Sequence, residues 1–174
     1  ALFAMSTVQA DPIASIKHVV VAGQSKSIAT ENTGVDTPFS IASIGKIFTA
    51  VLILQLVQDG RLNLEDPAAQ WLSRDVVEGF NGLAGVSIKQ MLQMSSGLPD
   101  YYDDRYLESV FIDQKKTQVP EVAIQYAYDL PVLFVPGKRF DYSNTNYLLL
   151  GVILENLAGE SYSQRPQYKA YFPV

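Results

Sequence analysis

The fold is decided by the stretch from Phe39 to Val57, which reads FSIASIGKIFTAVLILQLV. Apolar residues recur in it at helical spacing, and Gly60 follows as a residue typical of the position just after a helix. We therefore predict a helix that begins near Ser43. Because this helix is apolar on most of its surface, we expect it to lie in the interior of the protein.

A serine and a lysine lie one turn apart at the start of this predicted helix. Residues at i and i+3 share a helix face, so the Lys46 amine can reach the Ser43 hydroxyl. A serine hydroxyl is a weak nucleophile until a base takes its proton, and a lysine can do so if burial lowers its pKa. Backbone N–H groups at the helix N-terminus would stabilise an oxyanion beside Ser43. The simpler alternative is a serine N-cap followed by an incidental lysine.

A second candidate group, Tyr142-Ser143-Asn144, opens an apolar helical pattern just after the turn predicted at Pro136–Gly137. The Tyr142 phenol could relay a proton. The Asn144 side chain could donate to a substrate carbonyl while it accepts from Lys46. Taken without Ser43 and Lys46, the simpler interpretation is that Asn144 is an N-cap and Tyr142 only packs.

The remaining pattern predicts one or two early strands followed by helices. The β-branched run Val19–Val21 within Ile13–Ala22 indicates a buried strand, and residues 24–39 a loop or a poor second strand. Ser87 and Gln90 have the spacing of a capping box. We expect helical segments at Ala68–Leu72, from Val86 to Gly97, at Pro120–Asp129 and at Asn144–Leu157, with loop and short helix over 99–117.

Composition excludes several classes of function. The chain has 174 residues and a formal net charge of −5, which argues against nucleic-acid binding and against a polybasic membrane surface. It has no cysteine, so thiolate metal sites and cysteine nucleophiles are excluded. The one histidine, His18, lies beside the β-branched run and is interpreted as a packed or surface residue. We expect no cofactor and no metal.

Four segments, in this order, resemble the serine β-lactamase and penicillin-binding family, in the branch of class C β-lactamases, D-alanyl-D-alanine carboxypeptidases and related esterases. They are the active-serine segment Phe39–Ala50, the segment Leu56–Pro67, the segment Ser87–Asp100 that ends in the turn Met94-Ser-Ser-Gly-Leu-Pro-Asp100, and Pro136–Gly151 with its Tyr142-Ser-Asn144. Met94 stands where the family usually has histidine. The resemblance covers about residues 13–163.

The resemblance implies a role for each matching residue. Ser43 matches the acylated nucleophile and Lys46 its activating partner. Tyr142 matches the residue proposed to act with the lysine as general base, and Asn144 the contact to the substrate amide; which group takes the first proton is disputed in this superfamily. The backbone N–H of Ser43 matches one oxyanion donor.

The implied fold is α+β, a β-lactamase/transpeptidase-like fold that is truncated to a mostly helical subdomain and one or two N-terminal strands of an incomplete α/β sandwich. A third motif, Lys-Thr-Gly or a His-x-Gly variant, is missing from the sequence. We therefore expect a partial domain over residues 11–163 and a divergent tail over 164–174. A chain without the third motif is expected to turn over its substrate poorly.

The expected activity is that of an exported serine hydrolase that forms an acyl-enzyme on an amide, a β-lactam or an ester. Residues 1–10 resemble the end of a bacterial secretory signal, from which we expect a periplasmic or extracellular protein; the alternative is a frayed N-terminal helix of the mature domain. The alternatives are an inert fragment or pseudoenzyme that only binds a ligand, and an interaction protein whose apolar face another chain covers. The cluster Tyr101–Asp104 is interpreted as a solvated loop rather than a cleft or a cation site.

Overall fold

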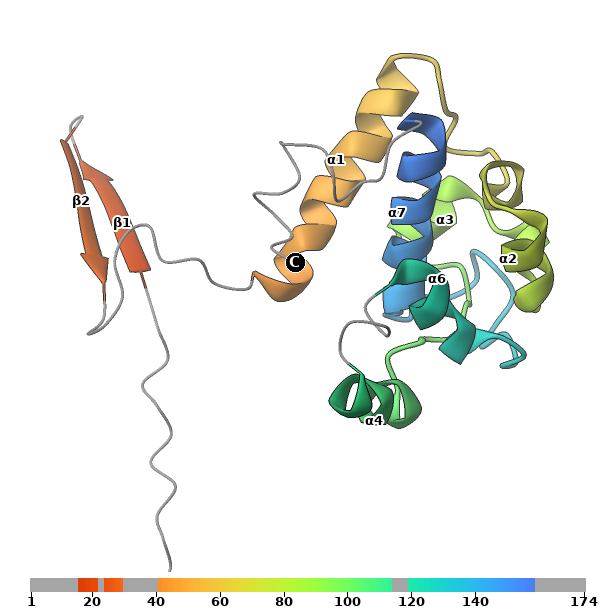
Figure 1. The fold of residues 1–174 in the computed structure, drawn as a ribbon. Helices are drawn as coiled ribbons and strands as arrows, with labels where there is room; N and C mark the ends of the chain where they lie inside the picture. The colour runs from red at the N-terminus through yellow and green to blue at the C-terminus, as the bar shows by residue number, and fades with distance from the viewer. Residues whose placement is uncertain (1–15, 22–23, 30–40, 114–118, 159–174) are drawn as a thin grey trace, which may run out of the picture. The chain divides into compact units, whose positions relative to one another are not determined.

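A computed structural model describes residues 16–21, 24–29, 41–113 and 119–158 (Figure 1). The chain divides into two units, Ala1–Ser40 and Ile41–Val174. The predicted signal remnant at 1–10 and the predicted tail at 164–174 lie outside the described residues.

The first unit contains a β-hairpin. Strand β1, Ile16–Val21, pairs antiparallel with strand β2, Gln24–Ala29, in a register that runs from Ile16 opposite Ala29 to Val21 opposite Gln24. β-branched residues fit the pleated backbone of a strand, which explains β1. The predicted early strand is confirmed, and the weaker second strand is real. His18 lies in β1 opposite Ser27.

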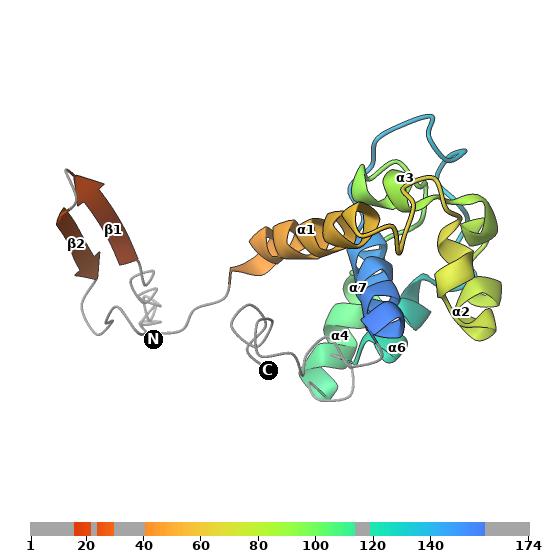
Figure 2. The ribbon, with the colours of Figure 1, turned by 90° about the horizontal axis from the view of Figure 1, so that it is seen from above.

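The second unit is helical, and two helices from distant parts of the sequence lie side by side in it. Helix α1, Gly45–Gln58, packs against helix α7, Asn144–Ala158 (Figures 1 and 2). Leu149, Leu150 and Ile153 of α7 are fully buried. Burying such side chains is worth about 1.5–3 kcal/mol each, so α7 is the centre of the core.

The prediction that the first helix lies in the interior is wrong for one of its faces. The buried positions of α1 are Gly45, Thr49 and Ile53. A stripe at helical spacing is instead exposed, namely Ile44, Ile47, Val51 and Leu54, with 46% to 61% of each side chain accessible. Because the helix is apolar on every side, its sequence could not show which face would be buried. In the described part of the chain, only one face packs against a neighbour.

Short helices follow α1, and the first and the last of them contact α7. They are the 3₁₀ turn η2 at Ala68–Trp71, α2 at Arg74–Gly79, the 3₁₀ turn η3 at Leu83–Gly85 and α3 at Ile88–Leu92. The predicted capping box is present, because Ser87 accepts from the Gln90 backbone while Gln90 accepts from the Ser87 backbone. Helix α3 ends before Gly97, since Met94 has a left-handed φ of 54°. Helix α2 was not predicted.

The segment that follows α3 contains two further helices and leads back to α7. Helix α4, Asp104–Ile112, is the short helix expected within 99–117, and α6, Pro120–Ala123, begins with the predicted proline. The 3₁₀ turn η4, Ile124–Ala127, continues α6 and contacts α7. The turn at Pro136–Gly137 is present, with Gly137 at a φ of 81°. None of the helices described is long and apolar enough to cross a membrane.

Candidate active site

Ser43 lies in the 3₁₀ turn η1, Ala42–Ile44, which leads directly into α1. Ala42 has a left-handed φ of 45°, a conformation that L-residues rarely adopt, and it turns the chain into the helix. Lys46 is in the first turn of α1, and its Nζ donates to Ser43 Oγ at 3.2 Å. The predicted i to i+3 contact is therefore present, although Ser43 itself belongs to a 3₁₀ turn.

Tyr142 and Asn144 reach the same pair from the start of α7. Ser43 Oγ lies 2.8 Å from Tyr142 Oη, and Lys46 Nζ donates to Asn144 Oδ1 at 2.7 Å. Lys46 Nζ also lies 5.1 Å from the centre of the Tyr142 ring, within the range of a cation–π contact. All four predicted site residues are thus joined in one network, across 98 and 99 residues of sequence.

Backbone hydrogen bonds between two loops hold Tyr142 and Asn144 in place. The loop after α3 accepts from the segment before α7 at three successive points: Leu133 N–H to Gly97 O, Gly137 N–H to Ser95 O, and Asp141 N–H to Met94 O. The hydroxyl groups of Ser143 and Thr145 then both donate to Pro99 O, at 3.2 and 2.7 Å. Hydrogen bonds to the loop 94–100, the template loop, therefore fix the position of residues 133–145.

Gly97 is required at the centre of that template. Its φ is 77°, and a Cβ built on it would collide with the carbonyl oxygen of Phe134. Only glycine combines this conformation with so close an approach of another backbone. Met94, at the position where histidine is usual in the resembling family, is buried and accepts a weak contact from Asn146 Nδ2 at 3.5 Å.

The network favours ionisation of Tyr142. Desolvation raises the pKa of the phenol, but hydrogen bonds from Lys46 and Ser43 and the charge of Lys46 outweigh it, so the pKa of Tyr142 lies below its ordinary value. The charge of Asp100 opposes this shift. An ammonium group has three donors and no acceptor. While Lys46 is charged, the hydroxyl proton of Ser43 can therefore be directed only toward Tyr142 within this trio.

Asp100 is a site residue that the sequence analysis missed. Its Oδ2 accepts from Asn144 Nδ2 at 2.9 Å, and its Oδ1 accepts from the backbone N–H groups of Asn144 and Tyr102, each at 3.1 Å. The negative charge of this carboxylate also interacts favourably with the positive, N-terminal end of the α7 dipole. The sequence offered Asp100 only as the last residue of a turn, because nothing local indicates a partner 44 residues later.

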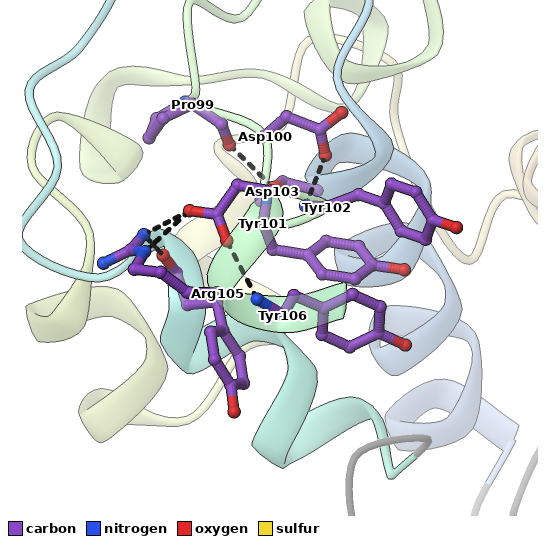
Figure 3. A network of polar contacts seen from close by, with 9 residues as sticks. Pro99, Asp100, Tyr101, Tyr102, Asp103, Arg105 and Tyr106 are labelled. Atoms are coloured by element: carbon purple, nitrogen blue, oxygen red, sulfur yellow. Dashed lines mark hydrogen bonds and ion pairs between the residues drawn. The ribbon is translucent and has the colours of Figure 1, made fainter. Parts of the chain in front are cut away.

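The neighbouring cluster Tyr101–Asp104 has a structural role (Figure 3). Asp103 caps α4 by accepting from the Tyr106 backbone at 3.0 Å, and it pairs with Arg105. Tyr106 stacks edge-on against Tyr101 with ring centres 5.0 Å apart, and burial raises the pKa of both phenols. No group of acidic or histidine side chains that could hold a metal occurs among the described residues.

The comparisons with known proteins agree with the family that the Ser-x-x-Lys pair and the Tyr-x-Asn pair of this helical unit resemble. The family model described as Beta-lactamase matches residues 18–167. The chain belongs to the β-lactamase family.

Its curated relatives are bacterial proteins that are much longer than this chain. Protein flp of Staphylococcus aureus (strain MW2) is 36% identical over 129 residues, which is 74% of this chain and 25% of that protein. Penicillin-binding protein 4* of Bacillus subtilis (strain 168) is 34% identical over 138 residues, 78% of this chain and 29% of that protein. The chain thus spans between a quarter and a third of the length of these relatives.

Among solved structures, a D-stereospecific amidohydrolase from Streptomyces sp. has the same fold over most of this chain. It superposes with a TM-score of 0.69 and 31% identity, and the match covers 85% of this chain and 44% of that one. The β-lactamase/transpeptidase-like fold predicted from sequence is therefore confirmed.

Proposed function

We propose that this protein is an acyl-transferring serine hydrolase in which Ser43 is the nucleophile and acts on an amide, a β-lactam or an ester. One observation carries the proposal: the Ser43 hydroxyl lies within hydrogen-bond distance of both Lys46 Nζ and Tyr142 Oη. A nucleophile bonded to a base that a third group orients is the pattern expected of covalent catalysis.

In the proposed first step, the Tyr142 phenolate takes the Ser43 proton while Oγ forms a bond to the substrate carbonyl carbon. The carbonyl electrons move onto its oxygen, and the Ser43 backbone N–H is the proposed donor to that oxyanion. Collapse of the intermediate breaks the carbonyl bond to nitrogen or oxygen, and Tyr142 returns the proton to the leaving group. Water then hydrolyses the acyl-enzyme. Lys46 stays positive throughout and stabilises the phenolate.

Asn144 is proposed to contact the substrate amide. Its Oδ1 is engaged by Lys46 and one hydrogen of its Nδ2 by Asp100. A carboxamide carries two N–H donors, so the second hydrogen of Nδ2 is the group proposed to bind the substrate carbonyl. Substrates with a D-configured residue are proposed because a relative in fold is described as D-stereospecific.

The nucleophile is tested by covalent labelling. A fluorescent penicillin and a fluorophosphonate should each label the wild-type chain on the peptide that contains Ser43. Ser43→Ala should abolish the label, whereas Ser109→Ala should keep it, because the Ser109 hydroxyl donates to Tyr106 O within α4. Labelling that persists in Ser43→Ala would refute the assignment. Relative rates with D- and L-amino-acid amides, an ester and a chromogenic cephalosporin would then identify the substrate class.

We also propose that the protein acts outside the cytoplasm, in the periplasm or beyond it. The small-residue pattern of residues 1–10 and the absence of cysteine support this. Fractionation of a bacterial host that makes the protein should recover it from the periplasm or the medium. Recovery from the cytoplasm alone would contradict export.

A further inference from the structure

We propose that Asp100 is a positioning residue for the acylation reaction, because its carboxylate sets the orientation of the Asn144 carboxamide and thereby directs Oδ1 of that amide at Lys46. The inference rests on the proposed function of Ser43 and adds a residue to it. It concerns the chain of contacts Asp100–Asn144–Lys46–Ser43, which crosses from the loop 94–100 through α7 to α1.

The hydrogen-bonding capacity of each group restricts how the Asn144 carboxamide can be oriented. An asparagine side chain can be turned by half a rotation about its last bond, which exchanges its oxygen and its nitrogen. Lys46 Nζ can only donate, so it requires the oxygen of Asn144 to face it. Asp100 can only accept while it is ionised, so it requires the Asn144 nitrogen on the opposite side. One orientation of the carboxamide meets both requirements. Lys46 Nζ donates to Asn144 Oδ1 at 2.7 Å, and Asn144 Nδ2 donates to Asp100 Oδ2 at 2.9 Å.

The position of Asp100 is itself fixed by backbone donors. Its Oδ1 accepts from the backbone N–H groups of Asn144 and Tyr102, each at 3.1 Å. Three donors therefore face the two oxygens of one carboxylate, and Figure 3 shows the bond to the Tyr102 backbone. The first backbone N–H of α7 is satisfied by this carboxylate, so the same residue that orients Asn144 also anchors the start of its helix.

An amide cannot replace the carboxylate at position 100. In Asp100→Asn, the new NH₂ group must face either the Asn144 side-chain nitrogen or the two backbone N–H groups, and both arrangements place donor against donor. This repulsion between donors is relieved only if the Asn144 carboxamide rotates, and the rotation would present its NH₂ group to the Lys46 ammonium. Lys46 would then lose its acceptor, and the Ser43–Lys46 geometry would loosen.

The neighbouring Asp103 is a matched control. It lies three residues after Asp100 as the N-cap of α4, and its carboxylate accepts from the Tyr106 backbone N–H at 3.0 Å and pairs with Arg105. The bonds of its side chain are to Tyr106 and Arg105, at the start of its own helix. An effect that appears in Asp100→Asn and not in Asp103→Asn is therefore specific to the contact with Asn144.

The first measurement is the rate at which a fluorescent penicillin acylates the full chain, recorded over a range of pH. A displacement of about 1 Å at a reacting group typically costs about 100-fold in rate. We expect Asp100→Asn to lower the rate by about that factor at every pH, and Asp103→Asn to leave it unchanged. The charge of Asp100 opposes ionisation of Tyr142. If Asp100 acted by its charge alone, the variant would instead shift the profile to lower pH without loss of maximal rate, and that result would overturn the proposal.

The second measurement does not depend on activity. The side-chain NH₂ resonances of Asn144, assigned by their loss in Asn144→Asp, should change in the ¹⁵N–¹H spectrum of Asp100→Asn and stay unchanged in Asp103→Asn. Unchanged Asn144 resonances in Asp100→Asn would overturn the inference. Absence of labelling in the wild type would count against the proposed function, and the spectrum would then decide the role of Asp100 by itself.

Exchange of the two side chains provides a rescue. The double variant Asp100→Asn/Asn144→Asp restores a donor opposite an acceptor at every contact, whereas Asn144→Asp alone places two carboxylates against each other. Both variants lack the Asn144 amide, so they differ only in the pairing with position 100. The double variant should acylate faster than Asn144→Asp, and an equal or slower rate would contradict the orienting role.

Discussion

Two polar networks flank the loop that leads from α3 to α4, and they differ in how far along the sequence they extend. The bonds of the Asp103 carboxylate are local, because they reach only Tyr106 and Arg105 within three residues, and the longest further contact of this network is from Arg105 to Tyr126 O, 21 residues away. The network at Ser43 joins η1, α1, the loop 94–100 and α7, through contacts that span 44, 98 and 99 residues. The local network fixes one helix end, and the long-range one exists only if two helices and two loops are all in place.

The difference predicts that the two networks respond differently to substitution. A change in the Asp103 network should cost the stability of α4 and leave acylation intact. A change in the Ser43 network should reduce acylation, either directly at the reacting groups or indirectly by loss of the loop pairing that positions α7.

The largest effect is expected for Lys46→Met, which removes the cation that contacts Ser43, Asn144 and the Tyr142 ring. Removing a group that stabilises charge in the reaction typically costs about 10²–10³-fold in rate, so penicillin labelling should slow by about that factor. The methionine side chain fills similar space, and the urea midpoint should change little. A variant that labels at the wild-type rate would remove Lys46 from the mechanism.

Gly97→Ala is expected to break the pairing between the two loops. The left-handed φ and the collision with Phe134 O together should cost about 2–5 kcal/mol of unfolding free energy. Penicillin labelling should fall with it, because Tyr142 and Asn144 lose their template. Chemical denaturation measures the cost.

Gly151→Ala is the matched control for that variant. Gly151 lies inside α7 with open space around its Cβ position. Alanine there should raise stability by about 1 kcal/mol, because glycine is a poor helix former. A comparable loss of stability in both variants would show that the loop conformation is not what Gly97 provides.

Tyr142→Phe should reduce labelling by about 10²-fold or more and should change its pH dependence. The pKa of Tyr142 lies below its ordinary value of 10.0. As pH rises toward that lowered pKa, more phenolate forms in the wild type and none in the variant. The ratio of wild-type to variant labelling rate should therefore increase with pH from neutral upward. A ratio independent of pH would argue that the tyrosine acts only as a hydrogen-bond donor.

The smallest effect on acylation is expected for Asp103→Ala. Loss of this N-cap should destabilise the protein by about 1 kcal/mol. The Asp103 pKa is lowered in the folded protein: desolvation raises it, but the bonds from Arg105 and Tyr106 outweigh that effect. Its stabilisation is therefore present above the pKa of the unfolded chain and is lost as pH falls through the folded value. Thermal melts should show a lower melting temperature for the variant than for the wild type at neutral pH. At acidic pH the two melting temperatures should be equal.

The sequence by itself determined the local features of this protein. Propensity, capping and turn signals act over a few residues, so β1, the capping box at Ser87, the proline at the start of α6 and the Ser43–Lys46 spacing were all readable. Tyr142 and Asn144 were candidates from their residue types, and the likeness of four motifs to a known family favoured site roles for them over packing and capping. Helix α2 was missed because its six residues carry too short a pattern to show periodicity.

Tertiary structure decided the rest, because it concerns groups that meet only when the chain is folded. Lys46 and Asp100 together determine which way the Asn144 carboxamide faces, and these three residues belong to three separate segments. No spacing within one segment can therefore predict that orientation. Likewise, α1 is apolar on every side in sequence, but packing against α7 buries one face and leaves Ile44, Ile47, Val51 and Leu54 exposed. A sequence pattern can show that a side chain is apolar or can accept a hydrogen bond, but only the fold determines which neighbour it meets.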